Sequence, residues 1–298
     1  MTRERAPRER RLWPALTTLY LAWGSTYLAI RVMVETVPPL LGAGVRFLAA
    51  AAILSVALIA LGGGRRLRVG GRPALAAAAV GTLILVGGIG LLTLAEQHVP
   101  SGLAALLIAS VPLWVVILRL VARERITLAT LAGVAGGFAG VALLVLPGDR
   151  AGDAPLGWLA VLLAAALFTA LGALASDRWT LPTDTMLATA IEMACAGTLL
   201  LALAFVAGEG AELDAGELSR RSLLALAYLV LIGSVVAYSA FVWLLEHANP
   251  STVATYAYVN PAVALILGWL ILSEEITPTT LAGALVILAS VALVVRRE

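Results

Sequence analysis

The sequence contains no lysine, a single cysteine and two histidines in 298 residues. All 20 basic residues are therefore arginine, and only 13% of the chain is charged, about half of what a soluble domain usually carries. Cys195 has no second cysteine to pair with, and the two histidines are isolated, so we expect neither an internal disulfide nor a metal site. The sequence also lacks a phosphate-binding glycine loop, a nucleophile elbow and a zinc motif, so no enzyme and no cofactor are expected.

What the chain has in excess is apolar residues, at 61% of the sequence with a mean hydropathy of +0.99. Apolar runs of about 20 residues recur, each long enough to cross a bilayer core of about 30 Å. A large soluble helical protein is disfavoured because the predicted helices have no solvated stripe. We therefore predict an all-α integral membrane protein with ten transmembrane helices, at about 12–33, 40–61, 73–95, 101–121, 128–146, 156–177, 184–207, 222–245, 252–272 and 279–295.

No separate signal peptide is expected at the start of the chain. The first apolar run begins at Leu12, is long enough to span a membrane and has no small-residue cleavage motif behind it. Its arginine-rich lead of 11 residues is too polar to be part of a span.

One stretch of the sequence occurs twice, half a chain apart. Residues 124–133 return as residues 274–283 with seven of ten pairs identical, and both copies begin with a Glu-x-Ile-Thr segment. Self-similarity at this spacing indicates two equivalent halves, which we predict to be residues 1–147 and 155–298, each a five-helix repeat. In a membrane protein this arrangement is typical of a transporter whose substrate site lies between the repeats.

The arginines predict the orientation of the chain. The N-terminal segment and alternate loops (around residues 65–72, 119–125 and 178) carry most of them, as do Arg296 and Arg297. Because positive loops stay on the cytoplasmic side, both termini are predicted to be cytoplasmic. Five spans per half is an odd number, so the second repeat enters the membrane from the opposite side and the two repeats are inverted.

The repeated motifs resemble those of a known family. The family-like segments are Trp23-Gly24-Ser25-Thr26-Tyr27, Arg46-Phe47, the stretch from Pro100-Ser101 to Pro112, and both Glu-x-Ile-Thr segments. Together they resemble the EamA branch of the drug/metabolite transporter superfamily over essentially the whole chain, and within it the YddG-type exporters of aromatic amino acids. The resemblance implies a ten-helix basket with a central cavity, lined by helices 1, 3, 4, 6, 8 and 9. Helices 5 and 10 would meet near the pseudo-two-fold axis.

Several charged residues lie inside predicted spans, where an unpaired charge is unfavourable. Arg31, Glu35 and Arg46 are predicted near the outer ends of the first two spans, either as a charged cluster at the outer mouth or as anchors that reach the interface. Glu192 lies within the seventh span, either as a proton-coupling group or as a structural acid bonded to a neighbouring helix.

Two glutamates occupy equivalent span ends, each followed by a Pro-Ser turn. Glu96 precedes Pro100-Ser101 and Glu246 precedes Pro250-Ser251, so each serine suits the N-cap of the next span. They are either simple helix-end hairpins or a pair of gates, one per face. Pro112 and Pro261 fall inside the fourth and ninth spans at matched positions, where they would kink the helices beside a transporter's site.

The remaining candidates are polar and aromatic residues that would be unfavourable against lipid and are therefore expected to face a cavity or the protein interior. Rings spaced along one face could stack with an aromatic substrate or engage a cationic one. The predicted cavity residues are Trp23, Tyr27, Thr93, Gln97, Ser110, Trp114, Tyr238, Phe241, Thr252, Tyr256 and Asn260. For the stripes in the first and ninth spans, simple packing explains the pattern equally well.

Four glycines in the fifth span, at positions 133, 136, 137 and 140, predict a close-packing surface, which makes that helix a scaffold or a contact between the halves.

These observations lead to one principal hypothesis and two alternatives. The principal one is an exporter of aromatic or apolar amino acids in the bacterial cytoplasmic membrane, working by alternating access and without tight proton coupling. The alternatives are an exporter of drugs or quaternary cations, and a non-transporting subunit of a membrane complex. The expected partners are a small-molecule substrate and the lipid bilayer, with no nucleic acid. The oligomeric state stays open, and a monomer is compatible with it.

Overall fold

The structure is a computed structural model that describes residues 5–62, 64–145, 154–214 and 216–295. Within these residues all regular secondary structure is helical. In chain order the helices are α1 (Arg5–Gly24), α2 (Thr26–Met33), α3 (Pro39–Gly62), η1 (Gly64–Leu67), α4 (Gly71–Gly81), η2 (Thr82–Gly90), α5 (Leu91–Ala95), α6 (Ser101–Ile108), α7 (Val111–Val121), α8 (Leu128–Val145), α9 (Leu156–Arg178), α10 (Thr185–Val206), α11 (Glu209–Glu212), α12 (Arg220–Tyr228), η4 (Leu229–Val236), α13 (Ala237–His247), α14 (Pro250–Val253), α15 (Tyr256–Leu272) and α16 (Pro278–Val295).

Eight helical segments in the described part of the chain are long and apolar enough to cross a membrane. Three of them join consecutive helices: Gly71–Ala95, Ser101–Val121 and Arg220–Leu245. The ends of all eight lie within two residues of the predicted boundaries. The two other predicted spans are interrupted, at Ser25 between α1 and α2 and before Tyr256 between α14 and α15. A total of ten spans therefore stays a prediction.

The outside of the molecule is apolar over much of its height. Large side chains such as Leu61, Leu75 and Val206 are 72–87% exposed. They lie on helices, whose backbone hydrogen bonds are satisfied internally. Such a surface is unfavourable in water and suits the hydrocarbon core of a bilayer.

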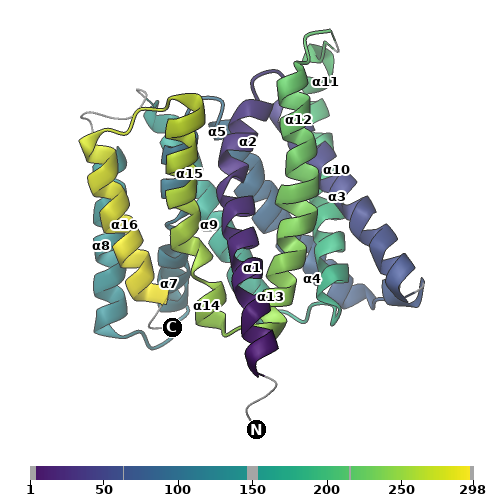
Figure 1. Ribbon diagram of the computed structural model, residues 1–298, viewed down its shortest axis with the longest axis horizontal. Coiled ribbons are helices and arrows are strands. Elements are labelled where there is room, and N and C mark those ends of the chain that lie inside the picture. The colour runs from purple at the N-terminus through teal and green to yellow at the C-terminus, as the bar shows by residue number, and fades with distance from the viewer. Residues whose placement is uncertain (1–4, 63, 146–153, 215, 296–298) are drawn as a thin grey trace.

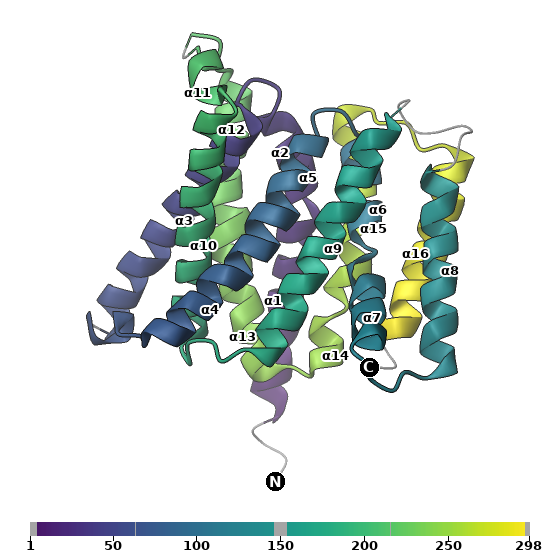
Figure 2. The same cartoon turned by 180° about the vertical axis from the view of Figure 1, so that it is seen from behind.

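The helices run between two faces, which we call lower and upper as drawn in Figure 1. Helix α1 begins and α16 ends at the lower face, where the connections from α3 to α4 and from α7 to α8 also lie. The same arrangement is seen from behind in Figure 2. The connection from α11 to α12 lies at the upper face.

Helix packing follows a regular scheme. Helix α3 packs along α10 and α8 packs along α16, while α6 packs on α15. Helix α9 packs on η2 as α1 packs on α13. Each half of the chain thus supplies one member of every pair, and α8 and α16 stand side by side at one edge of the molecule.

Glycines in α8 allow its close contact with α16. A Cβ atom at Gly140 would lie 2.8 Å from Ile287 Cγ1 and 3.0 Å from the Ile287 backbone nitrogen. Gly133 faces Val294 in the same way, whereas Gly137 faces Leu113 of α7. The predicted small-residue packing surface is therefore confirmed, with Gly137 directed to a different neighbour.

The spans that matter for the site are not uniform α-helices. The third span of each half contains a π-helical segment: η2, of nine residues, in the first half and η4, of eight residues, in the second. Such segments are rare and occur mostly at functional positions. The fourth span breaks at Ser110, so Pro112 stands in the first turn of α7. The expected mid-helix kink at Pro112 is thus a helix break, while Pro261 does lie inside α15.

Candidate functional site

Four aromatic side chains from three spans meet in the interior, and we call them the aromatic box. Trp23 of α1 lies with its ring centroid 5.2 Å from Tyr238, 5.1 Å from Phe241 and 5.2 Å from Tyr256. Phe241 and Tyr256 are 5.9 Å apart, edge to face. All four residues are partly exposed rather than sealed in the core. These separations and tilts are those of favourable aromatic pairs.

The local sequence brings the box together. Gly24 permits the close approach of α1 to α15, because a Cβ atom there would lie 2.7 Å from Val263. The Tyr20 hydroxyl forms a short hydrogen bond with the Thr255 hydroxyl across the same interface. Ser25, at the break between α1 and α2, bonds to the Tyr228 hydroxyl at 2.7 Å. The motif from Trp23 to Tyr27 thus joins the first span to the eighth and ninth.

Arg46 of α3 is 5% exposed and stands beside the box. Its Nε donates to Ser234 Oγ of η4 at 2.9 Å, and its guanidinium carbon lies 5.0 Å from the Phe47 ring centroid. Gly233 of η4 chiefly allows the close approach of α2, because a Cβ atom there would lie 2.8 Å from Thr26 Cγ2 and 3.4 Å from Arg46 Nη2. Among the described residues the bond to Ser234 is the only hydrogen bond of Arg46, so its terminal nitrogens remain available. Tyr238 and Glu96 are the charged or titratable groups that act on it electrostatically.

Glu96, directly after α5, is completely buried. Neither of its carboxyl oxygens has a hydrogen-bond partner within the part of the chain that the structure describes. Burial raises the pKa of Glu96 well above its usual value, and the nearby Glu274 carboxyl adds to this, while Arg31 and Arg46 act in the opposite direction. The Tyr27 hydroxyl lies within electrostatic range of both Glu96 and Tyr256.

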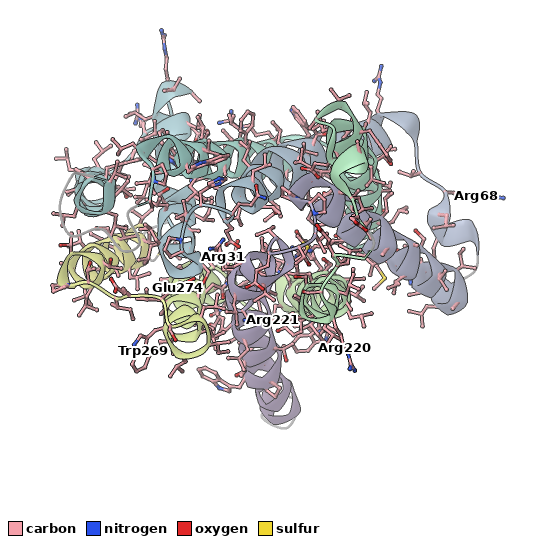
Figure 3. The ribbon with its side chains drawn as sticks, turned by 90° about the horizontal axis from the view of Figure 1, so that it is seen from above. Arg31, Arg68, Arg220, Arg221, Trp269 and Glu274 are labelled. Atoms are coloured by element: carbon pink, nitrogen blue, oxygen red, sulfur yellow. The ribbon has the colours of Figure 1, made fainter. Side chains whose placement is uncertain are left out.

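The predicted cluster of Arg31, Glu35 and Arg46 does not form as such. Arg31 donates to the backbone carbonyls of Glu96 and Gln97 at 2.6 and 2.9 Å, which caps the C-terminal end of α5. Glu35 is exposed and lies 3.8 Å from Arg221. Figure 3 shows Arg31 within the helical array, whereas Arg68 and Arg220 point outward.

Glu274, which sequence reasoning did not select as a site residue, binds the start of α6. Its two carboxylate oxygens accept from the backbone N–H groups of Ser101 at 2.8 Å and Gly102 at 3.0 Å. The contact is tight, because a Cβ atom at Gly268 would lie 2.3 Å from Glu274 Oε2. A carboxylate at this position satisfies free N–H groups of a helix start and complements its dipole. The predicted serine N-cap is therefore wrong for Ser101, which is itself the first residue of α6.

The equivalent residue of the first half has different partners. Glu124 accepts from Arg119 Nε at 2.8 Å and pairs with Arg178. The Arg119 bond, and after it that of Arg178, hold the pKa of Glu124 below its usual value. The threonine of each Glu-x-Ile-Thr segment caps the helix that follows it in the same way. The Thr130 N–H donates to Thr127 Oγ1 at 3.2 Å, and the Thr280 N–H donates to Thr277 Oγ1 at 3.1 Å. The two segments are therefore alike locally and differ in what the glutamate binds.

A pocket of about 530 Å³ opens between the start of α10 and α13, at the lower face. It is bordered by the Arg66–Asp184 ion pair and reaches Ser239 and Trp243 of α13. Ser239 directly follows Tyr238 of the aromatic box. The volume lies within the range of about 300–1,000 Å³ that is usual for small-molecule sites.

The other predicted cavity residues either lie outside the aromatic box or already use their hydroxyl groups in hydrogen bonds to the backbone. Trp114 stacks edge to face on Phe138 at 5.0 Å, away from the box. The hydroxyls of Thr93 and Ser110 donate to carbonyls of their own helices. Gln97 is exposed at the upper face. Thr252 is half-buried, and buried Asn260 is close to Gly24 of α1.

Of the two remaining acids, Glu192 is half-buried where α10 packs closely on Gly81 of α4. It forms no hydrogen bond or ion pair with the residues that the structure describes, so the proposed bond to a neighbouring helix is not observed. The side chain of Glu246 lies outside what the structure describes, and its role as a gate stays a prediction.

Two regions of the chain, residues 15–146 and 156–296, match the EamA-like transporter family. The chain belongs to this family. It is 42% identical over 258 residues to the uncharacterized inner membrane transporter YedA of Escherichia coli K12, covering 86% of this chain and 81% of YedA. It is 32% identical to a probable terminal-alkyne amino-acid exporter of Streptantibioticus cattleyicolor, over 95% of this chain and 93% of the exporter.

A solved crystal structure shares the fold, with a TM-score of 0.66 at 18% identity and coverage of 95% of this chain and 97% of that one. Like its relatives, this EamA-like protein is a membrane transporter.

Proposed function

We propose that the protein exports aromatic or large apolar amino acids across the bacterial cytoplasmic membrane. The observation that carries the proposal is the aromatic box beside Arg46, because four partly exposed rings offer a substrate ring edge-to-face contacts on several sides. The amino-acid exporter among the relatives and the inner-membrane location of YedA support it.

Transport is proposed to occur by alternating access between two inverted repeats, residues 1–147 and 155–298. The pairwise packing of α3 with α10, α8 with α16 and α6 with α15 supports this, because such pairs are expected if a pseudo-two-fold axis relates each helix to its partner. The identical threonine caps of α8 and α16 support it at residue level. The start of α1 and the end of α16 share the lower face with most arginine-bearing connections, which supports a cytoplasmic lower face.

Glu274 and Glu124 are proposed to act as alternating latches in this cycle. Glu274 ties the second repeat to α6 at the upper face, and this contact would hold that side closed. Glu124 is instead held by Arg119 and Arg178 at the lower face, and its transfer to the Pro250-Ser251 turn would close that side. The two glutamates would exchange these arrangements when the transporter turns to the outside.

A flux experiment with the purified protein in liposomes tests the function. Labelled phenylalanine, tryptophan, alanine and a quaternary amine are followed with and without a pH gradient. We expect saturable flux of the aromatic amino acids, present without a gradient. Absence of aromatic flux in protein that remains folded would contradict the proposal.

A second candidate function is the export of quaternary cations, which the buried, unpartnered carboxyl of Glu96 favours. Arg46 argues against it, because a buried guanidinium repels a cation. Flux of the amine alone would select this candidate.

A further inference from the structure

Two ionisable side chains of opposite type lie in the interior without being bonded to each other. Arg46 of α3 is 5% exposed, Glu96 at the end of α5 is fully buried, and α3 packs on α5, so the two groups lie within electrostatic range of each other. Within the described part of the chain they share neither an ion pair nor a hydrogen bond, and both Glu96 oxygens lack any partner. Leaving buried charged or polar groups unpaired is costly, so this arrangement calls for a ligand.

The surroundings of the pair limit what that ligand is. Tyr27 lies within electrostatic range of both Glu96 and Tyr256, and Tyr238 of the aromatic box lies within electrostatic range of Arg46. The other charged groups facing Glu96 are Arg31, whose guanidinium binds backbone carbonyls, and Glu274, which is held by α6. Arg46 therefore remains free to bind an anion and Glu96 to bind a cation, and the apolar aromatic box lies beside them.

We propose that Arg46 and Glu96 form a binding site for the zwitterionic head group of an α-amino acid. The terminal nitrogens of Arg46 bind the carboxylate, Glu96 binds the ammonium group, and the side chain enters the aromatic box. This inference rests on the proposed function and specifies the chemistry of its site. A guanidinium recognises a carboxylate through paired N–H groups, which a quaternary cation cannot use.

The orientation of the Arg46 side chain suits this role. Ser234 holds the Nε atom and so directs the other two nitrogens.

The test uses three probes that differ only at the head group: phenylalanine, 3-phenylpropionate without the ammonium, and 2-phenylethylamine without the carboxylate. Their affinities are measured as competition with labelled phenylalanine and as thermal stabilisation of the purified protein. The wild type should prefer phenylalanine over both. The Glu96→Gln variant should bind phenylalanine about 30-fold or more weakly than the wild type, and its affinity for 3-phenylpropionate should be unchanged. The Arg46→Gln variant should lose a similar factor in its affinity for phenylalanine, and its affinity for 2-phenylethylamine should be unchanged.

Glu217→Gln and Arg220→Gln remove exposed charges and serve as matched controls that should keep the wild-type order. Retained binding of the matching probe demonstrates that each variant is folded. Wild-type preference for phenylalanine that survives in both variants overturns the head-group site while leaving the exporter proposal intact. Lack of any phenylalanine binding by the wild type overturns the exporter proposal itself. Binding of the amine alone, lost in Glu96→Gln and unaffected in Arg46→Gln, overturns the head-group site in favour of a cation site.

Discussion

A buried carboxyl group keeps its proton unless a partner stabilises the charge, and Glu96 has no such partner in the described structure. Its ionisation state therefore depends on what occupies the site. A bound ammonium group favours the ionised form, so binding of a zwitterion should release a proton. Glu96 would then couple substrate binding to pH even where the transport cycle is not driven by a proton gradient.

The affinity for phenylalanine should accordingly rise with pH. Because burial raises the pKa of Glu96, its neutral form persists above the usual range of a glutamate, and binding costs less as the pH approaches that raised value. We expect calorimetric binding in buffers of different ionisation enthalpy to report proton release. The dependence should disappear in Glu96→Gln, and a wild-type affinity that is constant with pH would contradict the assignment.

Among the helices, the contact between Glu274 and the start of α6 is the proposed latch of the upper face. The Glu274 carboxylate accepts two hydrogen bonds from backbone N–H groups there, each of a type worth about 1.5–3 kcal/mol. The residue beside it, Glu275, is exposed and provides a control of the same chemistry.

Glu274→Gln should shift the protein towards the form open at the upper face, by about tenfold if roughly 1.4 kcal/mol is lost. A thiol reporter at Ser101→Cys in a Cys195→Ala background measures the shift, because Ser101 is fully buried under the latch. Its labelling rate should rise about tenfold in Glu274→Gln and remain unchanged in Glu275→Gln. Equal rates in both variants would show that the latch does not control access.

The interface between α8 and α16 should tolerate no added volume. Gly140→Val places atoms against the Ile287 backbone, and overpacking of this kind costs about 1–3 kcal/mol. We expect a lower melting temperature for this variant. Gly157→Ala is the control, since nothing lies within 4 Å of the added Cβ atom in the first turn of α9.

The sequence allowed the spans and the aromatic stripes to be predicted, because hydrophobic length and helical period are local properties. Trp23 and Tyr256 could be selected on that basis. The Glu274 latch could not, since its partner lies 173 residues away and the repeated motif shows only that the segment recurs. The hydrogen bond from Arg46 to Ser234, 188 residues apart, carried no sequence signal either. Ser110 had been assigned to a cavity, but its hydroxyl completes the turn at the helix break.

For the molecule as a whole, the proposed inverted repeats place both chain ends on one side of the membrane. Helix α1 starts and α16 ends at the lower face, and the connection from α11 to α12 lies at the upper face. In intact cells, a thiol at Asp214→Cys in the Cys195→Ala background should react with an impermeant reagent, while tags at the two termini should be protected until the membrane is opened. Accessible termini would reverse the proposed direction of export.

If an aromatic amino acid passes through the aromatic box, as we claim, the ratio of phenylalanine to alanine flux in liposomes should depend on the rings of the box. Trp23→Leu and Tyr256→Leu each remove ring contacts worth about 0.5–1.5 kcal/mol apiece, so the ratio should fall about tenfold in each variant. Trp269→Leu removes an exposed ring that points away from the helical array and should leave the ratio at its wild-type value. An unchanged ratio in both box variants would contradict the claim.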